Sequence, residues 1–330
     1  MPLLSRALLP GKNRESEIAV REAAVPMSLR SPFSNVAVSA VAASESPLAP
    51  SELPARSAVF STCANPDCSS GWLKLFRPRS APCFEGGWCC SAACVRAQIA
   101  AAMRRETDAR AAGGETHSHR IPLGLAMLEQ GWITGAQLRG ALEAQHSAGA
   151  GRLGYWLIRA EGVSEQQVTR ALGLQWSCPV LNAEFHDADG LALLVPRLFV
   201  DAFGALPLRT AAGRILYLGF EDRLDTVLAF AVERMTGLRV ECGMVATSVF
   251  RPAHSAMLAA AFAAVELIEA SSEAALALVL ARTVEQARPV DSRLVRVHDC
   301  FWLRMWLRPQ IGAFPERNSV RDVIATSRAH

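Results

Sequence analysis

The stretch from Pro122 to Trp176 contains one pattern twice, thirty residues apart, and this repeat constrains the fold more than any other feature of the chain. Nine pairs of identical or similar residues keep a single register. They are Leu123/Leu153, Gly124/Gly154, Leu128/Ile158, Ile133/Val163, Thr134/Ser164, Gln137/Gln167, Leu138/Val168, Leu142/Leu172 and Gln145/Gln175. Chance does not readily preserve so many positions, so the two segments are interpreted as copies of one structural unit.

Each copy is predicted to fold as a helix, a turn and a second helix. Thr134 and Gln137 have the spacing of a capping box, in which two side chains satisfy free amide groups at a helix start. Ser164 and Gln167 repeat that spacing in the second copy. Apolar residues follow each box at the i, i+3, i+4 spacing of a buried helix face. Such packing does not readily require the Leu-Gly pair at the head of each copy, where Gly frees the backbone, or the Gln at its end.

Composition limits the partners expected for this chain. A length of 330 residues predicts two or three folded units, and a hydrophobic content of 51% is enough for their cores. A net charge of +3 is too small to indicate nucleic acid or an anionic membrane. The longest apolar run, 257–268, contains Glu266 and is shorter than the roughly 20 residues that cross a bilayer. Because residues 1–10 lack a secretory signal, we expect a cytoplasmic protein without membrane insertion, starting at Met1 or Met27.

Six of the nine cysteines fall between Cys63 and Cys94. In a cytoplasmic chain such a cluster favours a metal site over a disulfide framework. Cys63 with Cys68, and Cys90 with Cys94, are the two pairs expected to hold a structural Zn²⁺ in a tetrahedral array. Cys89 could replace Cys90 as a ligand, and the alternative is a set of buried or incidental thiols. Four thiolates leave no open position, so a catalytic metal is not expected.

The Cys-Ser-x-x-Cys segment at Cys90–Cys94, followed by a predicted helix over 95–110, resembles the treble-clef-like TRASH and MYM-type zinc modules. In those modules a knuckle of this kind opens a helix. The resemblance implies a small zinc module of about forty residues.

The expected fold class is mixed α and β, either α+β or α/β, with the tandem helical motif packed with a small β-sheet flanked by helices. The expected segments are a disordered leader over 1–57, a Cys-rich zinc-binding module over 58–110, a linker over 111–119, a domain over 120–268, a helix and β-hairpin over 271–310, and a loose tail over 311–330. His117 and His119 in the linker are expected to be solvated and not to bind metal.

Strands and helices alternate after the repeat. We predict strands over 205–208, 214–219 and 238–244, helices over 225–236, 248–268 and 273–287, and a hairpin of 293–298 with 301–307. Arg293, Arg296 and Arg304, with the neighbouring tryptophans, could line a nucleic-acid surface. Amphipathic strands with one basic face are the commoner explanation, so no nucleic-acid partner is expected.

The repeat is similar to the MshE-type N-terminal domain of type II secretion and type IV pilus assembly ATPases, the GspE N-terminal domain. The similarity continues through 194–196, 205–208, 213–216, Asp225 and 236–240, and so covers about 120–260. It implies that the tandem motifs wrap one molecule of cyclic di-GMP. The ligand-binding residues that it implies are Leu123, Gly124, Gln145, Arg152, Leu153, Gly154 and Gln175.

This sequence departs from the family pattern in three places. Pro122 stands where the family has Arg, although Arg120 is close, and Glu161 stands where a Gly is expected. The linker from Gln145 to Arg152 is one residue longer than usual. The chain contains no G-x-x-x-x-G-K-[ST] motif and therefore no P-loop of an ATPase motor, and no nucleophile or acid–base motif indicates another enzyme.

Two functions are consistent with these residues. The first is a non-catalytic cytoplasmic regulatory or adaptor protein that binds cyclic di-GMP through the repeat and contacts secretion or pilus machinery, with structural Zn²⁺ in its Cys-rich module. The alternative is a zinc-stabilised protein-interaction domain that keeps the fold and has lost nucleotide binding.

Overall fold

The computed structural model describes residues 63–69, 81–112, 120–183, 188–310 and 314–327. All of them belong to one compact unit, Phe60–His330. The leader predicted over 1–57, and His117 and His119 of the predicted linker, lie outside the described residues. In the part of the chain that the structure describes, no helix is long and apolar enough to cross a membrane.

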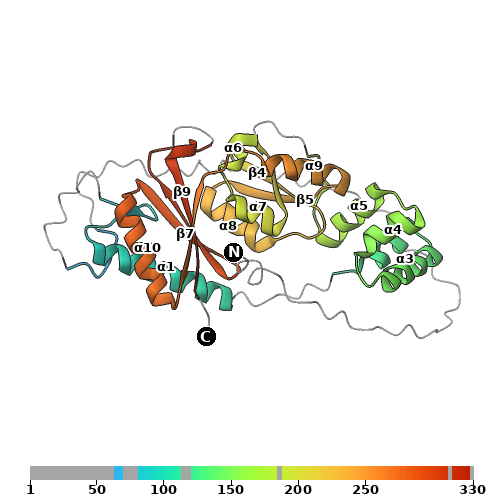
Figure 1. The fold of residues 1–330 in the computed structure, drawn as a ribbon, viewed down its shortest axis with the longest axis horizontal. Helices are drawn as coiled ribbons and strands as arrows, with labels where there is room; N and C mark the ends of the chain where they lie inside the picture. Colours follow the sequence, from blue (N-terminus) through green and yellow to red (C-terminus); the bar gives the residue numbers. More distant parts are fainter. Residues whose placement is uncertain (1–62, 70–80, 113–119, 184–187, 311–313, 328–330) are drawn as a thin grey trace, which may run out of the picture. The chain divides into compact units, whose positions relative to one another are not determined.

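The fold combines helices and small sheets, as predicted (Figure 1). In chain order the elements are β1 (Cys83–Phe84), β2 (Gly87–Trp88), α1 (Ala92–Ala112), α2 (Leu123–Glu129), α3 (Gly135–Ala148), α4 (Leu153–Glu161), α5 (Glu165–Trp176), α6 (Ala188–Ala192), α7 (Arg197–Phe203), β3 (Ala205–Ala211), β4 (Ile215–Phe220), α8 (Thr226–Thr236), β5 (Arg239–Met244), α9 (Thr247–Leu258), β6 (Ala264–Ala270), α10 (Glu273–Ala287), β7 (Asp291–Val297), β8 (Cys300–Trp306), η2 (Arg317–Ser319) and β9 (Val320–Ser327).

Each copy of the repeat forms helix, turn and helix, as predicted, with α2 and α3 in the first copy and α4 and α5 in the second. The helices pack across the copies, α3 against α4 and α2 against α5. Both capping boxes are present at the starts of α3 and α5. The hydroxyl of Thr134 accepts from the Gln137 amide N–H at 3.2 Å, and the Ser164 hydroxyl accepts from that of Gln167 at 3.3 Å. The buried core of the repeat is small. Its fully buried members are Met127, Ile133, Ala141, Leu157, Val163, Val168 and Ala171.

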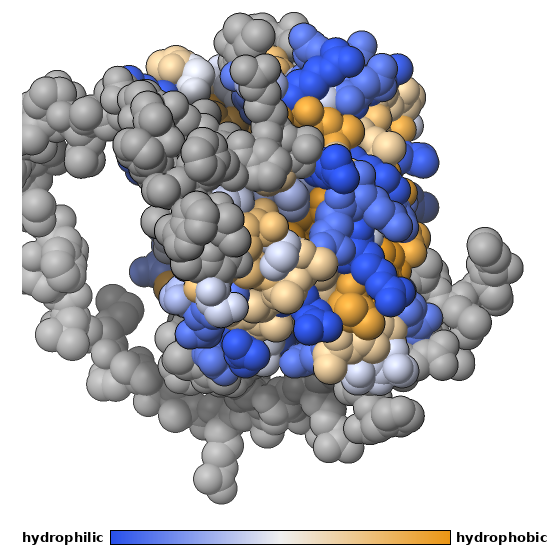
Figure 2. All heavy atoms as spheres, turned by 90° about the vertical axis from the view of Figure 1, so that its left-hand side faces the viewer, coloured by the Kyte–Doolittle hydropathy of each residue, from blue (hydrophilic) through white to orange (hydrophobic). Residues whose placement is uncertain are grey.

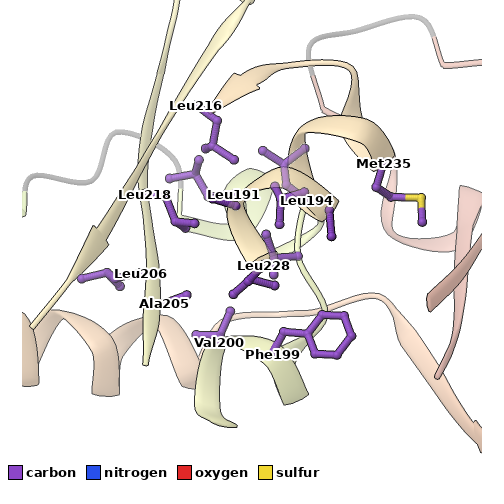
Figure 3. Packing of buried hydrophobic residues seen from close by; sticks show 14 of the residues in the cluster. Leu191, Leu194, Phe199, Val200, Ala205, Leu206, Leu216, Leu218, Leu228 and Met235 are labelled. Atoms are coloured by element: carbon purple, nitrogen blue, oxygen red, sulfur yellow. The ribbon is translucent and has the colours of Figure 1, made fainter. Parts of the chain in front are cut away.

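A three-stranded sheet with the order β3-β4-β5 follows the repeat. Strands β3 and β4 are antiparallel, whereas β4 and β5 are parallel and are joined through α8. The Asp225 carboxylate caps α8 by accepting from the Leu228 amide N–H at 2.8 Å, and Gly237 ends the helix with φ +73°. Leucines from β4, from α8 and from the segment around α6 point toward one another and fill the space between the strands and the helices (Figure 3).

A second sheet contains four strands in the order β6-β9-β8-β7 and corrects two predictions. The run 248–268 is not one helix, because α9 ends at Leu258 and β6 begins at Ala264. The segment 311–330 is not a loose tail throughout, because β9 lies between β6 and β8. Both errors have one cause: β6 pairs with β9, and β9 pairs with β6 and β8, which are distant in the chain, and local propensity does not indicate such pairing.

The Cys-rich segment and α1 pack against this four-stranded sheet together with α10. One apolar cluster contains residues of α1, α10, β7, β8 and β9 together with five cysteines of the Cys-rich segment, three of them buried and two partly buried, so the predicted module over 58–110 and the predicted segment over 271–310 share a core. The turn after β1 also bonds to the edge strand β7, since the Glu85 amide N–H donates to the Ser292 carbonyl at 2.7 Å. On the side that carries α10 and α1, hydrophilic and hydrophobic residues alternate over the visible surface (Figure 2).

The middle of the sheet holds a buried ion pair. The Arg304 guanidinium donates to the Asp322 carboxylate at 2.7 Å, and the side chains are 2% and 0% exposed. The Trp302 indole N–H donates to the same carboxylate at 2.8 Å, and Arg304 also donates to the Leu194 carbonyl at 2.8 Å. The predicted basic strand face is therefore wrong for Arg304, and neither Arg304 nor Trp302 can line a nucleic-acid surface.

Candidate functional site

The two copies of the repeat present the same surface. Residues 121–130 and 151–160 follow one sequence of exposed, half-buried and buried positions, with a difference only at Ala126 and its equivalent Trp156. Leu125 is 54% exposed and its equivalent Tyr155 is 51% exposed. We call residues 120–124 the first head and residues 150–154 the second head.

The two terminal glutamines join each copy to the head of the other. The Gln145 side-chain amide donates to the Gly151 carbonyl at 2.8 Å, and the Gln175 amide donates to the Ile121 carbonyl at 2.9 Å. Gly151 and Ile121 are equivalent positions, because each lies two residues before the Leu of its head. The crossed pair of hydrogen bonds gives the repeat an approximate two-fold symmetry.

The two glycines of the heads are buried where helices meet. A Cβ on Gly124 would lie 2.6 Å from the Leu138 Cδ1, and one on Gly154 would lie 2.9 Å from the Val168 Cγ1. Both separations are shorter than real Cβ contacts, so a side chain at either position would force its neighbour to move, and Val168 has less freedom to move than Leu138. Packing therefore accounts for these positions, which the sequence argument had reserved for a ligand.

The leucines of the heads, Leu123 and Leu153, are half-buried and pack against the core of the repeat. The Leu153 Cδ2 would lie 3.3 Å from a Cβ on Gly124, and the Leu123 Cδ2 would lie 3.5 Å from one on Gly154. Each leucine thus contacts the glycine of the other head, which repeats the two-fold relation of the glutamines.

The arginine of the second head contacts the connection between β4 and α8, whereas the arginine of the first head lies on an aromatic ring. Arg152, with a side chain 68% exposed, forms an ion pair with Asp222. In the first head, the Arg120 guanidinium lies over the Trp176 ring, 3.5 Å from its centroid. Burial and the nearby positive charge of Arg223 lower the pKa of Arg120. Asp222 could not be predicted from the repeat, since the connection lies far from it along the chain, and Trp176 was not among the predicted ligand-binding residues.

Glu161, the second departure from the family pattern, contacts Gly140 of α3. A Cβ on Gly140 would collide with the Glu161 carboxylate, and the Gln137 side-chain amide donates to the Glu161 carbonyl at 3.4 Å. The Glu161 carboxylate therefore occupies space that Gly140, which has no side chain, leaves open on the facing helix.

The four cysteines predicted as metal ligands lie together. The Sγ atoms of Cys63, Cys68, Cys90 and Cys94 are all within 4.8 Å of one another. The Cys68 and Cys90 sulfurs are 3.4 Å apart, and those of Cys90 and Cys94 are 3.7 Å apart. Zn–S bonds of about 2.3 Å in a tetrahedron put sulfurs about 3.8 Å apart, so the donor set and its geometry fit Zn²⁺.

The surroundings of the thiol cluster act on its charge in two directions. Burial raises the pKa of Cys63 to about 12, but the backbone N–H groups of Cys90 and Asn65 bond to its sulfur and act in the opposite direction. The Asn65 side-chain amide donates to the Cys94 sulfur at 3.5 Å. Cys89 is buried outside the group of four, and burial raises the pKa of its thiol to about 12. The geometry therefore selects Cys90 over Cys89.

Comparison with solved structures finds partial similarity. The structure of MshE with cdg is similar to this chain at 26% identity and a TM-score of 0.35, over 42% of this chain and 99% of that one. Two crystal forms of the N-terminal domain of XpsE are similar at 20% and 21% identity, with TM-scores of 0.29 and 0.24. Each covers 40% of this chain, and 91% and 92% of the XpsE chains are covered. No family model and no curated protein matches this chain.

Proposed function

We propose that this chain is a non-catalytic, cytoplasmic regulatory or adaptor protein whose repeat binds cyclic di-GMP and which contacts secretion or pilus machinery. The observation that carries this proposal is the crossed pair of glutamine hydrogen bonds. Gln145 and Gln175 each tie one copy to the head of the other, at 2.8 Å and 2.9 Å. A receptor with approximate two-fold symmetry suits a ligand made of two identical nucleotides.

The chemistry of the heads is compatible with such a ligand. Leu125 and Tyr155 are equivalent, exposed and apolar, and can cover the faces of two guanine bases. Arg120 and Arg152 bring a guanidinium to each head, and guanidinium groups bind phosphate and the guanine edge through paired hydrogen bonds. Because position 122 is Pro, the guanidinium of the first head comes from Arg120, two residues earlier in the chain.

Calorimetric titration of the full chain with cyclic di-GMP tests this function. We expect saturable binding of one ligand per chain, and loss of binding in the double variant Arg120→Ala/Arg152→Ala. The control is Arg139→Ala/Arg159→Ala, which removes two exposed arginines of α3 and α4 outside the heads and should bind as the wild type does. Absence of heat at high ligand concentration with folded wild-type protein contradicts the proposal.

The alternative function, a protein-interaction domain without a nucleotide, draws on the same exposed side chains. Leu125 and Tyr155 expose about half of their surface, as contact residues in a protein interface do before the partner binds. This function predicts that substitution of both residues by Ser abolishes capture of a protein partner, while cyclic di-GMP has no effect.

We also propose that Cys63, Cys68, Cys90 and Cys94 hold one structural Zn²⁺. Zinc there would link the start of α1 to the segment before β1 and so stabilise the core that α1 shares with α10. Metal analysis of protein purified under reducing conditions should find one zinc per chain. Cys90→Ser should lose it, and Cys242→Ser, outside the cluster, should retain it. A metal content near zero in the wild type contradicts this proposal.

A further inference from the structure

A cavity lies between the Cys-rich segment and the end of α10. Its volume is about 360 Å³, and its wall includes the predicted zinc ligand Cys90 together with two charged residues, Glu285 and Arg288. We propose that this cavity binds a small thiol of the amino-acid type, and that Cys90 is the ligand which such a thiol displaces from zinc. This inference rests on the proposed structural zinc and adds a route by which the metal enters and leaves.

The cavity reaches from solvent to the thiol cluster. Ser91, Ala92 and Arg288 of its wall are exposed, whereas Cys90 is half-buried. A small molecule can therefore enter between the start of α1 and the end of α10 and meet Cys90. Cys68, the other half-buried ligand, is not among the described residues that line the cavity.

The predicted ligands differ in how firmly the fold holds them. Cys63 and Cys94 are buried, with 8% and 5% of their surface exposed. Cys94 lies in the first turn of α1, and the Asn65 side-chain amide donates to its sulfur at 3.5 Å. Cys90 lies in the irregular segment between β2 and α1. A residue outside regular structure can move with less loss of hydrogen bonding than one in a helix, so Cys90 is the ligand that leaves most readily.

The exchange at Cys90 conserves charge and electrons. The sulfur of the entering thiol loses its proton and takes the place of the Cys90 sulfur, and the Cys90 sulfur gains a proton. Four sulfur ligands are present before and after the exchange, so neither an oxidant nor a reductant is needed. A site of this kind admits such an exchange, because the coordination of zinc can expand from four to five ligands during a reaction.

The charged residues of the wall define the class of thiol. Glu285 and Arg288 lie three residues apart at one end of α10, and both line the cavity. A guanidinium binds a carboxylate through paired hydrogen bonds, and a carboxylate binds an ammonium group. The wall thus combines a metal-ligating sulfur, a cation and an anion. Free cysteine has the three matching groups, which are a thiol, a carboxylate and an ammonium group.

The test follows the release of zinc from the full chain in the presence of four thiols. A coloured zinc indicator takes up the released metal, and a phosphine keeps every thiol reduced. L-cysteine carries both charges, N-acetylcysteine lacks the ammonium group, cysteamine lacks the carboxylate, and 2-mercaptoethanol lacks both. The rates are compared at equal thiolate concentration, because the thiolate is the metal ligand.

Two adjacent alanines test the position of the entry. Ala92→Phe puts a large side chain on the cavity wall, and Ala93→Phe puts the same side chain on an exposed neighbour that is not among the lining residues. We expect Ala92→Phe to slow release by all four thiols about fivefold or more, because the entering thiol must displace the added ring. Ala93→Phe should release zinc as the wild type does. Both alanines are exposed, so both variants should fold, and thermal melting checks this.

Three variants of the end of α10 test the class of thiol. Glu285→Gln and Arg288→Asn each remove one charge from the wall, and Asn tolerates the left-handed backbone at position 288, where φ is +47°. The control Arg282→Gln removes an exposed arginine of α10 that is not among the lining residues.

The charges of the wall should set the order of the thiols. In the wild type and Arg282→Gln, we expect L-cysteine to release zinc about three to ten times faster than N-acetylcysteine or cysteamine, with 2-mercaptoethanol slower still. Glu285→Gln should cancel the advantage of L-cysteine over N-acetylcysteine, because the ammonium group loses its partner. Arg288→Asn should cancel its advantage over cysteamine, because the carboxylate loses its partner.

The remaining outcomes separate this inference from the proposed zinc site. If the wild type holds one zinc but Ala92→Phe and Ala93→Phe release it at equal rates, the zinc site stands and exchange through the cavity is wrong. If Ala92→Phe slows release but the order of the four thiols is the same in the wild type, Glu285→Gln and Arg288→Asn, the proposed class of thiol is wrong. If the wild type holds no zinc, both the zinc site and the exchange are wrong.

Discussion

The tandem repeat and the four-stranded sheet are stabilised in contrasting ways. The repeat is built from neighbours in the chain, with its caps, its head glycines and its crossed glutamines all within residues 121–175. The sheet collects β6 to β9 with α1, which ends at Ala112, and it has a buried ion pair at its centre. Loss of one cap in the repeat affects one helix, whereas loss of one group in the sheet affects elements that lie far apart in the chain.

The largest effect is expected in the sheet. Asp322→Ala leaves the buried Arg304 guanidinium without its counter-ion and removes the acceptor of the Trp302 indole, so we expect a loss of about 3–5 kcal/mol in the free energy of unfolding. Urea titration followed by tryptophan fluorescence measures it. Glu266→Ala removes the partner of Arg321, an ion pair with both side chains more than 40% exposed, and should cost less than about 1 kcal/mol. Equal losses of unfolding free energy in Asp322→Ala and Glu266→Ala would contradict the prediction that the buried ion pair contributes more than the exposed one.

Gly154→Ala tests the repeat with an intermediate effect. The added Cβ would lie 2.9 Å from the Cγ1 of Val168, a side chain with little rotamer freedom, so we expect a loss of about 1 kcal/mol or more. Gly135→Ala is the matched control, because its Cβ would meet nothing closer than 3.7 Å. Alanine is the better helix former there, and the control should gain up to about 1 kcal/mol. Thermal melting compares the two variants, and an equal loss of stability in both would contradict the packing role of Gly154.

The capping boxes should produce smaller and equal effects. Thr134→Ala and Ser164→Ala each remove the hydroxyl that accepts from an amide N–H at the start of a helix, and each should cost about 1 kcal/mol. Ser164→Thr keeps a hydroxyl and should cost much less. Unfolding curves for the three variants decide whether the two copies contribute equally, and a loss confined to one copy would contradict that equality.

The smallest effect is a dependence on pH at Asp225, which joins α8 to the β7–β8 turn. Burial alone would raise the pKa of Asp225, but the hydrogen bonds from His298 and from the Leu228 amide, with the nearby charges, lower it below its ordinary value. A carboxyl group with a lowered pKa in the folded state stabilises the protein above its ordinary pKa and loses this contribution as pH falls through the folded value. Asp225→Asn should therefore be less stable than the wild type at neutral pH, with a gap that shrinks below about pH 4. Unfolding curves between pH 3 and 7 measure the gap, and a constant gap would contradict the prediction.

The sequence was most informative where the structure is local. The helix pairs, both capping boxes, the helix ended by Gly237 and the helix over 273–287 follow from patterns within a few residues and agree with the structure. The four clustered thiols also follow from short spacings, although only the fold distinguishes Cys90 from Cys89.

The sequence was least informative where distant segments meet. The local sequence predicts helix for β6 and a loose tail for β9, because the strands that pair with them lie far away in the chain. Arg304 resembled a surface residue because its partner Asp322 lies eighteen residues away in the chain. Asp222 could not be predicted for the same reason, since nothing in the repeat indicates which connection its second head will contact.

The position of α1 on the sheet also has a consequence for biosynthesis. Val95, Ile99 and Met103 of α1 are buried in the core shared with β7, β8 and β9, but the ribosome completes α1 about 150 residues before it starts β6. At about 5 to 20 residues per second, the apolar side of the helix waits on the order of ten to thirty seconds for its partners. A metal ion captured early by the nearby cysteines would hold the start of the helix during that interval, so zinc supply during translation is expected to influence how much of the nascent chain escapes aggregation.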